Sequence, residues 1–313
     1  MMIGNPQLSV QPGGRSFMRS HLLTPTELGE FQVSPLGIGT SRLGAFWQKR
    51  SIKEGEEALN RALDLGVGLV DTADVYARGI SERIVGRAVK HRDDVAVMTK
   101  VGLLKTPRGI LNARKHSGGA GLQGLKAATA AATCFEPGYV EEAAVACMRR
   151  QGKDELDILL LHEPTAVDFE RSGLIEQLNS MKDRGLIRAW GASVRHEADA
   201  VAAAGAEGLS WLQVPINLGN TAIADAVQPL TEDIQVVGIA VLGDGSLLPQ
   251  VTAGGLNRPK AVAAMVEGAY QHPAIDAVLL GMSRPSHVTE NLAALERGAS
   301  EADIESARKI LES

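Results

Sequence analysis

Four side chains that can hold or move a proton stand at the ends of short apolar runs in this chain. Asp71 ends one such run, and Tyr76 lies five residues beyond it. Lys100 follows the next run, and His162 follows the one after that. A phenol has an ordinary pKa of about 10 and is a poor acid at neutral pH, but a neighbouring ammonium lowers that pKa. A carboxylate would keep the ammonium charged and a neutral imidazole could orient a carbonyl group, so the set predicts proton donation to a carbonyl oxygen.

Taken singly, each of these residues has a common structural explanation. A lone Asp or Lys at the end of a strand usually forms an ion pair, and a lone His is usually just hydrogen-bonded. Whether the four meet depends on the elements that position them. Eight short β-branched or leucine-rich runs alternate with longer amphipathic stretches, which predicts parallel strands connected by helices. Eight such units in 313 residues predict a single (β/α)8 barrel domain of the TIM type, with a doubly wound sheet as the alternative.

In such a barrel the active site forms at the C-terminal ends of the strands, so the four residues would share one rim. The expected strands are Leu36–Gly39, Leu69–Asp71, Val95–Thr99, Asp157–Leu161, Ile187–Gly191, Trp211–Pro215, Gln235–Ala240 and Ala277–Gly281. The expected helices are Gly55–Leu65, Glu82–Lys90, Tyr139–Arg150, Leu174–Arg184, Glu197–Ala204, Ala222–Leu230, Lys260–Tyr270, Val288–Leu295 and Glu301–Leu311.

Two segments depart from this alternation. The barrel is expected over residues 31–313 behind an N-terminal extension of residues 1–30, with Phe31–Val33 pairing with Ser34–Ile38 as a hairpin over the barrel floor. Leu103–Cys134 reads as a long loop after the third strand, and it contains basic residues but no acidic one. Loops of this length are usually lids or mobile segments. This one could attract an anionic substrate or cofactor phosphates, or simply be solvated.

Composition excludes several classes of function. Lys and Arg number 32 against 37 Asp and Glu, a net charge of −5, which gives no global reason to bind nucleic acid or an anionic membrane. No run reaches about 18 apolar residues and the first 30 residues lack a signal-peptide core, so the chain is expected to be cytoplasmic. Its two cysteines fit a reducing compartment. No metal site is predicted, and the oligomeric state stays open.

The segments around the four residues resemble the signature of the aldo-keto reductases. The matching segments, in order within residues 31–297, are Asp71–Tyr76 with Ser81-Glu82 and Gly86, Thr99–Val101, Leu161–Pro164, Gly191–Ser193, and Gly281–Ser283 with Glu290-Asn291. The resemblance implies a (β/α)8 barrel that binds a nicotinamide dinucleotide in extended form. It implies Tyr76 as the general acid, Lys100 and Asp71 as the pair that tunes it, and His162 as the carbonyl-orienting group.

The same resemblance implies NADP as the cofactor, with NAD as the alternative, and a small-molecule carbonyl substrate. Ser193 and Gln213 match positions that hold the nicotinamide carboxamide. Val194 replaces a common Asn there, and Ile216 replaces a tyrosine that stacks on the nicotinamide in many members. The other residues implied at the cofactor are Gly39, Thr40, Leu242, Gly243, Gly245, Ser283, Arg284, His287, Glu290 and Asn291.

Three further segments bear on how a dinucleotide would bind. The glycines of Leu242–Gly245 would let backbone approach a pyrophosphate, but Asp244 opposes an anion there unless it points away. Arg284 favours NADP over NAD. The stretch Gly119–Gly124 matches the dinucleotide fingerprint G-x-G-x-x-G, but no strand precedes it, so we interpret it as a chance match.

The sequence leaves alternatives for the substrate pocket and for the direction and type of the reaction. Phe46 and Trp47 are candidates for the substrate pocket, and Trp190 is a candidate either for the pocket or for the core. The same site could run in reverse as an aldose or secondary-alcohol dehydrogenase. The chain could also be a nucleotide-binding regulatory subunit with little turnover, or a barrel lyase or isomerase that forms a Schiff base at Lys100.

Overall fold

The computed structural model describes residues 21–43, 52–105, 107–116 and 132–312. Eight parallel strands close into a barrel in the order β10–β11–β12–β3–β4–β5–β8–β9. They are β3 (Leu36–Gly39), β4 (Leu69–Asp71), β5 (Ala96–Val101), β8 (Leu156–His162), β9 (Ile187–Ser193), β10 (Trp211–Pro215), β11 (Gln235–Ile239) and β12 (Ala277–Gly281). The predicted barrel is confirmed, and each expected strand is present with ends within two residues of the prediction.

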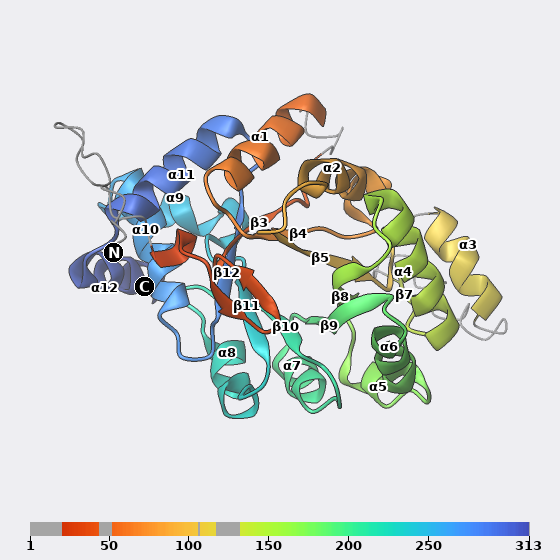
Figure 1. Ribbon diagram of the computed structural model, residues 1–313. Coiled ribbons are helices and arrows are strands. Elements are labelled where there is room, and N and C mark those ends of the chain that lie inside the picture. The colour runs from red at the N-terminus through yellow and green to blue at the C-terminus, as the bar shows by residue number, and fades with distance from the viewer. Residues whose placement is uncertain (1–20, 44–51, 106, 117–131, 313) are drawn as a thin grey trace, which may run out of the picture.

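Helices surround the barrel, as Figure 1 shows. Those expected from the sequence are α1 (Ile52–Asp64), α2 (Ile80–Val89), α4 (Pro137–Gln151), α6 (Leu174–Asp183), α7 (Glu197–Ala204), α8 (Ala222–Val227), α10 (Arg258–Tyr270), α11 (Pro285–Arg297) and α12 (Glu301–Glu312). Helix α1 shows why they form: its buried residues Ala58, Leu59, Ala62 and Leu63 recur every three or four positions and face the core. Two further short helices, α5 (Ala166–Phe169) and α9 (Leu247–Ala253), precede α6 and α10.

Five helices begin two or three residues earlier than predicted, because their first turns carry no apolar repeat. Pro137 and Pro285 open α4 and α11 at positions where the missing N–H costs nothing. At α10 the side chain of Asn257 accepts a hydrogen bond from the Lys260 N–H at 3.1 Å and so caps the helix. Proline at the first position and the capping side chain of Asn257 therefore decide where these three helices begin.

A hairpin closes the N-terminal end of the barrel, with a pairing that differs from the prediction. Strand β2 (Phe31–Val33) pairs with β1 (Thr26–Leu28), and not with Ser34–Ile38, so that prediction is wrong. The physical reason is that β3 uses both of its edges to pair with β12 and β4. The ring of Phe31 packs edge-on against Trp211, the first residue of β10, with centroids 5.9 Å apart.

The expected boundary between residues 30 and 31 falls inside this hairpin. Upstream of it, a 3-10 turn at His21–Leu23 buries both of its leucines in the core. The chain is therefore packed against the barrel from His21 onward, within the described residues.

The insertion after β5 is more regular than the expected loop. It carries β6 (Leu103–Leu104), α3 (Pro107–His116) and β7 (Ala132–Thr133), and β6 pairs antiparallel with β7. Figure 1 shows α3 on the outer side of α4. His116 Nε2 lies 3.0 Å from Glu142 Oε2 of α4, so this basic segment finds its acidic partner on the neighbouring helix. The stretch Gly119–Gly124 lies outside the described residues.

Candidate active site

The barrel brings Asp71, Tyr76, Lys100 and His162 to one rim. Asp71 and His162 are the last residues of β4 and β8, and Lys100 lies next to the end of β5. The Lys100 ammonium forms an ion pair with the Asp71 carboxylate and lies 3.1 Å from the Tyr76 hydroxyl. The Tyr76 and His162 rings pack edge to face with centroids 5.9 Å apart. The proton-handling groups thus form one contiguous cluster.

Lys100 stays charged although it is only 2% exposed. Burial alone would lower its pKa, but the Asp71 carboxylate and the Tyr76 oxygen outweigh burial, so the pKa of Lys100 is raised. Its Nζ also donates to the Thr72 carbonyl oxygen at 3.2 Å. A buried ammonium with these partners is a fixed positive charge beside the phenol.

The pKa of Tyr76 moves in the direction opposite to the sequence prediction. Burial of the phenol raises its pKa, and the Lys100 ammonium opposes this shift without reversing it. Tyr76 is therefore a protonated phenol at neutral pH. It can donate a proton, and the ammonium 3.1 Å away can stabilise the phenolate that donation leaves.

His162 is neutral at physiological pH. Burial lowers its pKa well below the ordinary value, and the positive charges of Lys100, Lys105 and Arg195 add to the effect. Its Nδ1 atom is buried and has no hydrogen-bond partner among the described residues. A neutral imidazole with a free ring nitrogen can hold a polar group of a ligand.

Ser193 and Gln213 stand beside these groups because of strand register. Ser193 of β9 is level with His162 on one side and with Gln213 of β10 on the other. Gln213 Nε2 donates to Asp71 Oδ1 at 2.8 Å, which leaves its Oε1 buried and without a hydrogen-bond partner in the described part of the chain. An amide oxygen in this state suits a ligand that carries an N–H donor, such as a carboxamide.

The two departures from the family pattern lie in the packed interior. Val194 and Ile216 are fully buried. Ile216 packs over Gly238 of β11, where its Cγ2 would be 2.7 Å from an added Cβ. Neither residue lines the cavities described below.

Two cavities adjoin at this rim. A cavity of about 500 Å³ contains Tyr76, His162 and Gln213 in its wall, and one of about 670 Å³ lies between β11, β12, α9 and α11. They share the wall residues Gly39, Ser41, Arg42, Ala240, Asp244, Leu279, Leu280 and Gly281. Together they form a continuous trough that an extended molecule could occupy.

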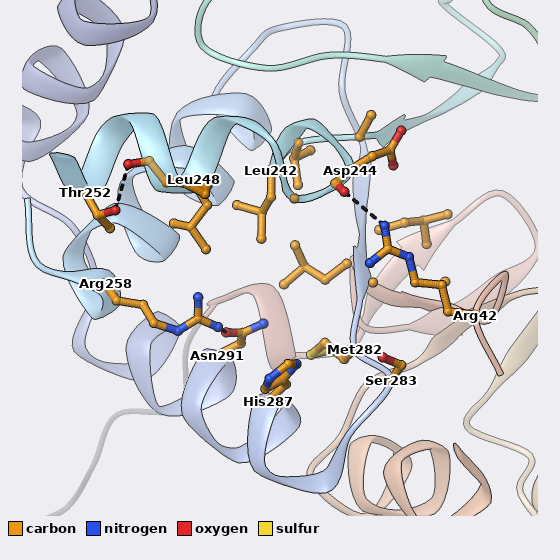
Figure 2. Close-up of a pocket in the computed structure, with 18 of the residues that line it drawn as sticks. Arg42, Leu242, Asp244, Leu248, Thr252, Arg258, Met282, Ser283, His287 and Asn291 are labelled. Carbon is orange, nitrogen blue, oxygen red and sulfur yellow. Dashed lines mark hydrogen bonds between the residues drawn. The ribbon is translucent and has the colours of Figure 1, made fainter. Parts of the chain in front are cut away.

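The larger cavity contains half of the twelve residues expected at a cofactor (Figure 2). Those in its wall are Gly39, Leu242, Gly245, Ser283, His287 and Asn291. Gly243 belongs to the same 3-10 turn as Gly245, over Gly243–Gly245. Thr40 lies behind the wall, where its Oγ1 donates to the Asp71 carbonyl oxygen at 2.7 Å.

Arg284 and Glu290 are not brought into this wall. Arg284 Nε lies 3.8 Å from Glu54 of α1, and the exposed Glu290 lies 3.8 Å from Arg258 Nε. In their place the structure presents Arg42 and Arg258, which sequence reasoning missed. Arg42 follows the end of β3 by three residues and could have been found by its position, but Arg258 starts a helix far from any strand end and carries no such signal.

The turn after β11 has the backbone that its glycines suggest. Gly243, Asp244 and Gly245 all have positive φ, at +63°, +53° and +94°. The Asp244 carbonyl oxygen accepts a hydrogen bond from Arg42 at 3.0 Å. Figure 2 shows the Asp244 carboxylate pointing away from the end of the cavity that holds Arg258 and His287. The acidic side chain therefore leaves that end of the trough free for an anion.

The expected substrate residues are only partly placed. Phe46 and Trp47 lie outside the described residues. Trp190 is completely buried, and its Nε1 donates to Asn179 of α6 at 2.9 Å. Because alternate residues of a barrel strand face opposite sides, Trp190 lies between the barrel and the helix layer and lines neither cavity. The residues that do reach the mouth beside Tyr76 include Lys105 and Arg195, which also were not predicted.

Other classes of site receive no support in the described ranges. No group of three or more His, Cys, Asp or Glu side chains there could hold a metal ion. Within the same ranges no helix combines the length and the apolarity needed to span a bilayer. Cys134 and Cys147 are both buried and free.

Comparison with known proteins agrees with the geometry. The sequence model of the aldo/keto reductase family matches residues 35–263. Aldo-keto reductase YhdN of Bacillus subtilis is 29% identical over 66% of the chain, and the NADH-specific methylglyoxal reductase of Escherichia coli is 26% identical over 92%. The matched region spans 56% of YhdN but 98% of the Escherichia coli protein. It spans only about half, 49%, of the oxidoreductase YqkF of Bacillus subtilis, to which the chain is 30% identical.

Solved structures share the fold. Aldo-keto reductase AKR11C1 of Bacillus halodurans, in its holo form, superposes with a TM-score of 0.71 and 21% identity over 92% of this chain and 96% of its own. An aldo/keto reductase of Klebsiella pneumoniae in complex with NADP and acetate gives a TM-score of 0.66 and 23% identity, over 92% of this chain and 95% of its own.

Proposed function

Because this chain belongs to the aldo/keto reductase family, we propose that it reduces the aldehyde or ketone group of a small molecule to an alcohol, with Tyr76 as the general acid. One observation carries the proposal. The Lys100 ammonium is held between the Asp71 carboxylate and the Tyr76 hydroxyl, in the wall of a cavity. An ion pair with a purely structural role would not need a tyrosine hydroxyl 3.1 Å from the Lys100 ammonium in the cavity wall.

We propose NADPH as the cofactor, with NADH as the alternative. When bound, the dinucleotide supplies the hydride. The continuous trough fits an extended molecule, and the unpaired amide oxygen of Gln213 fits a carboxamide at its Tyr76 end. The residues that would hold the remaining parts are Ser193, the turn Gly243–Gly245, Arg258, His287 and Asn291.

The protein's own groups then have distinct tasks. Tyr76 donates its hydroxyl proton to the carbonyl oxygen of the substrate, and Lys100 stabilises the phenolate that remains. Asp71 keeps Lys100 charged in a site that would otherwise favour the neutral amine. The neutral imidazole of His162 hydrogen-bonds to the substrate oxygen and fixes its orientation towards Tyr76.

The same groups serve the reverse reaction, because the acid in one direction is the base in the other. Alcohol oxidation therefore belongs to the proposal as its reverse direction. A Schiff base at Lys100 is disfavoured, since only a neutral amine is nucleophilic and the pKa of Lys100 is raised. A regulatory subunit without turnover would not require the complete set of four residues.

Substitution of Tyr76 by Phe tests the proposal. We expect Tyr76→Phe to bind NADPH as the wild type does and to lose carbonyl reduction by roughly 10²- to 10⁴-fold, the usual contribution of a general acid. NADPH oxidation with a panel of small aldehydes and ketones measures turnover, and fluorescence titration measures binding. Tyr270→Phe, at the end of α10, is the matched control. Wild-type turnover in Tyr76→Phe would overturn the assignment.

A further inference from the structure

A separate cleft lies beside the N-terminal ends of the barrel strands. It has a volume of about 660 Å³, and α2 and α4 contribute most of its wall. The wall also includes the starts of three strands: Val95 precedes β5, Asp157 is the second residue of β8 and Arg188 is the second residue of β9. Among the described residues this cleft shares none with the two cavities at the Tyr76 rim. A molecule bound here would therefore not occupy the proposed active site.

The described wall of this cleft is strongly basic. Eight of its residues are Lys or Arg and only two are Asp, although the whole chain has a net charge of −5. Six of the eight cations are arginines. A cleft lined by one sign of charge focuses the electrostatic field and raises the local concentration of counter-ions. The cleft thus attracts anions that the protein as a whole does not.

Helical spacing brings several of these cations together. Arg83, Arg87 and Lys90 follow one another along α2 at intervals of four and three residues, which places them on one face of the helix. The last turn of α4 adds Arg149 and Arg150 to the same cleft. Like charges at such spacings repel one another, so an anion bound among them would relieve the repulsion.

Five of the eight cations form ion pairs, and the pairs hold them at the cleft. Arg87 Nε lies 3.1 Å from Glu56, for example, and Arg188 Nη2 lies 3.2 Å from Glu30. Of the five carboxylates in these pairs, Asp157 is the only one that belongs to the described wall. A guanidinium has five N–H donors, so one that is paired outside the wall keeps donors for a ligand within it.

The other three cations, Arg83, Lys90 and Arg149, are exposed and form no ion pair within the described part of the chain. The partial negative charge of a helix C-terminus explains Arg149 in the last turn of α4 and Lys90 directly after α2. It does not explain Arg83, the fourth residue of α2, because a cation near a helix N-terminus is disfavoured. Three cations without a carboxylate partner suit an anion that carries several charges in a small volume.

We propose that this cleft binds a small molecule that contains a chain of phosphate groups, as inorganic triphosphate and nucleoside triphosphates do. The planar guanidinium group matches phosphate oxygens with two parallel hydrogen bonds, and arginines predominate in the wall. A volume of about 660 Å³ lies within the range of small-molecule sites. The inference does not depend on the reduction of carbonyl compounds, since the two sites have no described wall residue in common.

Calorimetric titration with inorganic triphosphate at low ionic strength tests the proposal. We expect the double variant Arg83→Gln/Arg149→Gln to raise the Kd at least roughly tenfold, because it removes two guanidinium groups that can bind phosphate. Both side chains are exposed, so the variant should fold, and thermal unfolding checks this. The control with the same change in charge is Arg297→Gln/Arg308→Gln, which alters exposed arginines of α11 and α12 outside the cleft and should bind as the wild type does.

Three further titrations locate the ligand and identify its chemistry. Arg258→Gln, in the wall of the larger cavity, should bind triphosphate as the wild type does. Citrate, a compact polycarboxylate, should bind more weakly than triphosphate. ATP should bind at least as tightly as triphosphate, and a gain in affinity would assign a contact to the nucleoside.

Several results would overturn the inference. These are no binding of triphosphate, equal weakening in the two double variants, loss of binding in Arg258→Gln in place of Arg83→Gln/Arg149→Gln, equal affinity for citrate, and weaker binding of ATP than of triphosphate. The first two would reduce the cleft to a charged surface, and the third would place the anion in the dinucleotide trough. The last two would remove the assignment to a chain of phosphate groups.

Discussion

Lys100 and Asp71 place two opposite charges in the interior, where removing them from water is costly. A buried ion pair of this kind rarely stabilises a fold more than an apolar pair of similar volume would. Here the pair is also fixed by Gln213 and by the Thr72 carbonyl oxygen. The arrangement makes sense as an electrostatic device for Tyr76, because it holds an ammonium in one place without water.

His162 should leave a measurable mark on how stability depends on pH. In the folded protein its pKa lies well below 6.5, whereas the unfolded chain takes up a proton there. The unfolded state therefore binds more protons below about pH 6.5, and the free energy of unfolding falls as pH drops, by up to about 1.4 kcal/mol per pH unit. We expect urea unfolding between pH 8 and 5 to show a smaller loss in His162→Gln than in the wild type.

The matched variant for this measurement is His91→Gln, which changes an exposed imidazole at the end of α2. It should keep the wild-type pH slope. Equal slopes for His162→Gln and the wild type would show that the imidazole of His162 is not held neutral by the fold.

At this scale the sequence predicted residue identities better than their energetics. The strand-end positions of Asp71, Lys100 and His162 were enough to select them. The direction of the Tyr76 pKa shift was not predictable, because it depends on how deeply the ring is buried. Trp190 belongs to the core and not to the pocket, a choice that the sequence left open because alternation along a strand does not reveal which side faces the helices.

Among the elements, the contact between α2 and α4 fixes the segment that carries Tyr76. Helix α2 begins directly after this segment, and its Glu82 forms an ion pair with Arg150 of α4. The two helices approach closely at Gly86, where an added Cβ would lie 2.0 Å from the Gln151 carbonyl oxygen. The glycine is therefore required by the close approach of backbone to backbone.

Gly86→Ala should destabilise the protein. The methyl group meets main chain that cannot move aside as a side chain could, and overpacking of this kind costs about 1–3 kcal/mol. Thermal unfolding measures the loss, and we expect kcat to fall as well because α2 would shift relative to Arg150. In the control Gly205→Ala, φ is −83° and the nearest atom is 3.6 Å away, so stability should be equal or slightly higher. Unchanged stability of Gly86→Ala would contradict the tight packing described here.

The elements themselves were largely predictable, and the exceptions have physical reasons. The apolar repeats located the eight barrel strands and nine of the helices. They did not reveal that Phe31–Val33 pairs with Thr26–Leu28, since a three-residue run contains no information about its partner. Helix α3 was read as loop because it has few apolar residues and associates with α4 through charged contacts.

For the whole molecule, the larger cavity carries a guanidinium towards each of its ends, and the proposed preference for NADPH depends on Arg258. Arg42 and Arg258 lie towards opposite ends of the larger cavity in Figure 2. Arg258 Nη2 is 3.4 Å from Asn291 Oδ1, which keeps the guanidinium in the wall beside His287. Arg284, which in the sequence analysis favoured NADP over NAD, faces Glu54 on α1.

Arg258→Ala should therefore weaken NADPH binding selectively. Arg258 would bind the adenosine 2′-phosphate, which NADPH has and NADH lacks. A hydrogen bond to a charged group contributes about 1.5–3 kcal/mol, so we expect the Kd for NADPH to rise at least roughly tenfold and the Kd for NADH to change little. Fluorescence titration with both dinucleotides measures this, and Arg284→Ala is the control with a smaller effect. Equal weakening of both cofactors in Arg258→Ala, or a larger effect in Arg284→Ala, would assign the charge elsewhere.

At this scale the sequence predicted the architecture and the side of the barrel that holds the site. Eight alternating units leave few other closed topologies, and a parallel barrel places its strand ends on one face. Arg258 could not be found in this way, since it lies between β11 and β12 at the start of a helix and enters the wall only through tertiary packing.

The hairpin at the N-terminal end of the barrel has a consequence for how ligands enter and leave. Phe31 and its neighbours in the hairpin pack against Trp211 and against the inward-facing side chains of the barrel strands. Within the described residues this hairpin covers the N-terminal end of the barrel, so in the proposed reaction the dinucleotide and the carbonyl compound would both reach the site from the C-terminal face. Binding and release would then be ordered: the molecule that binds deeper has to bind first and dissociate last.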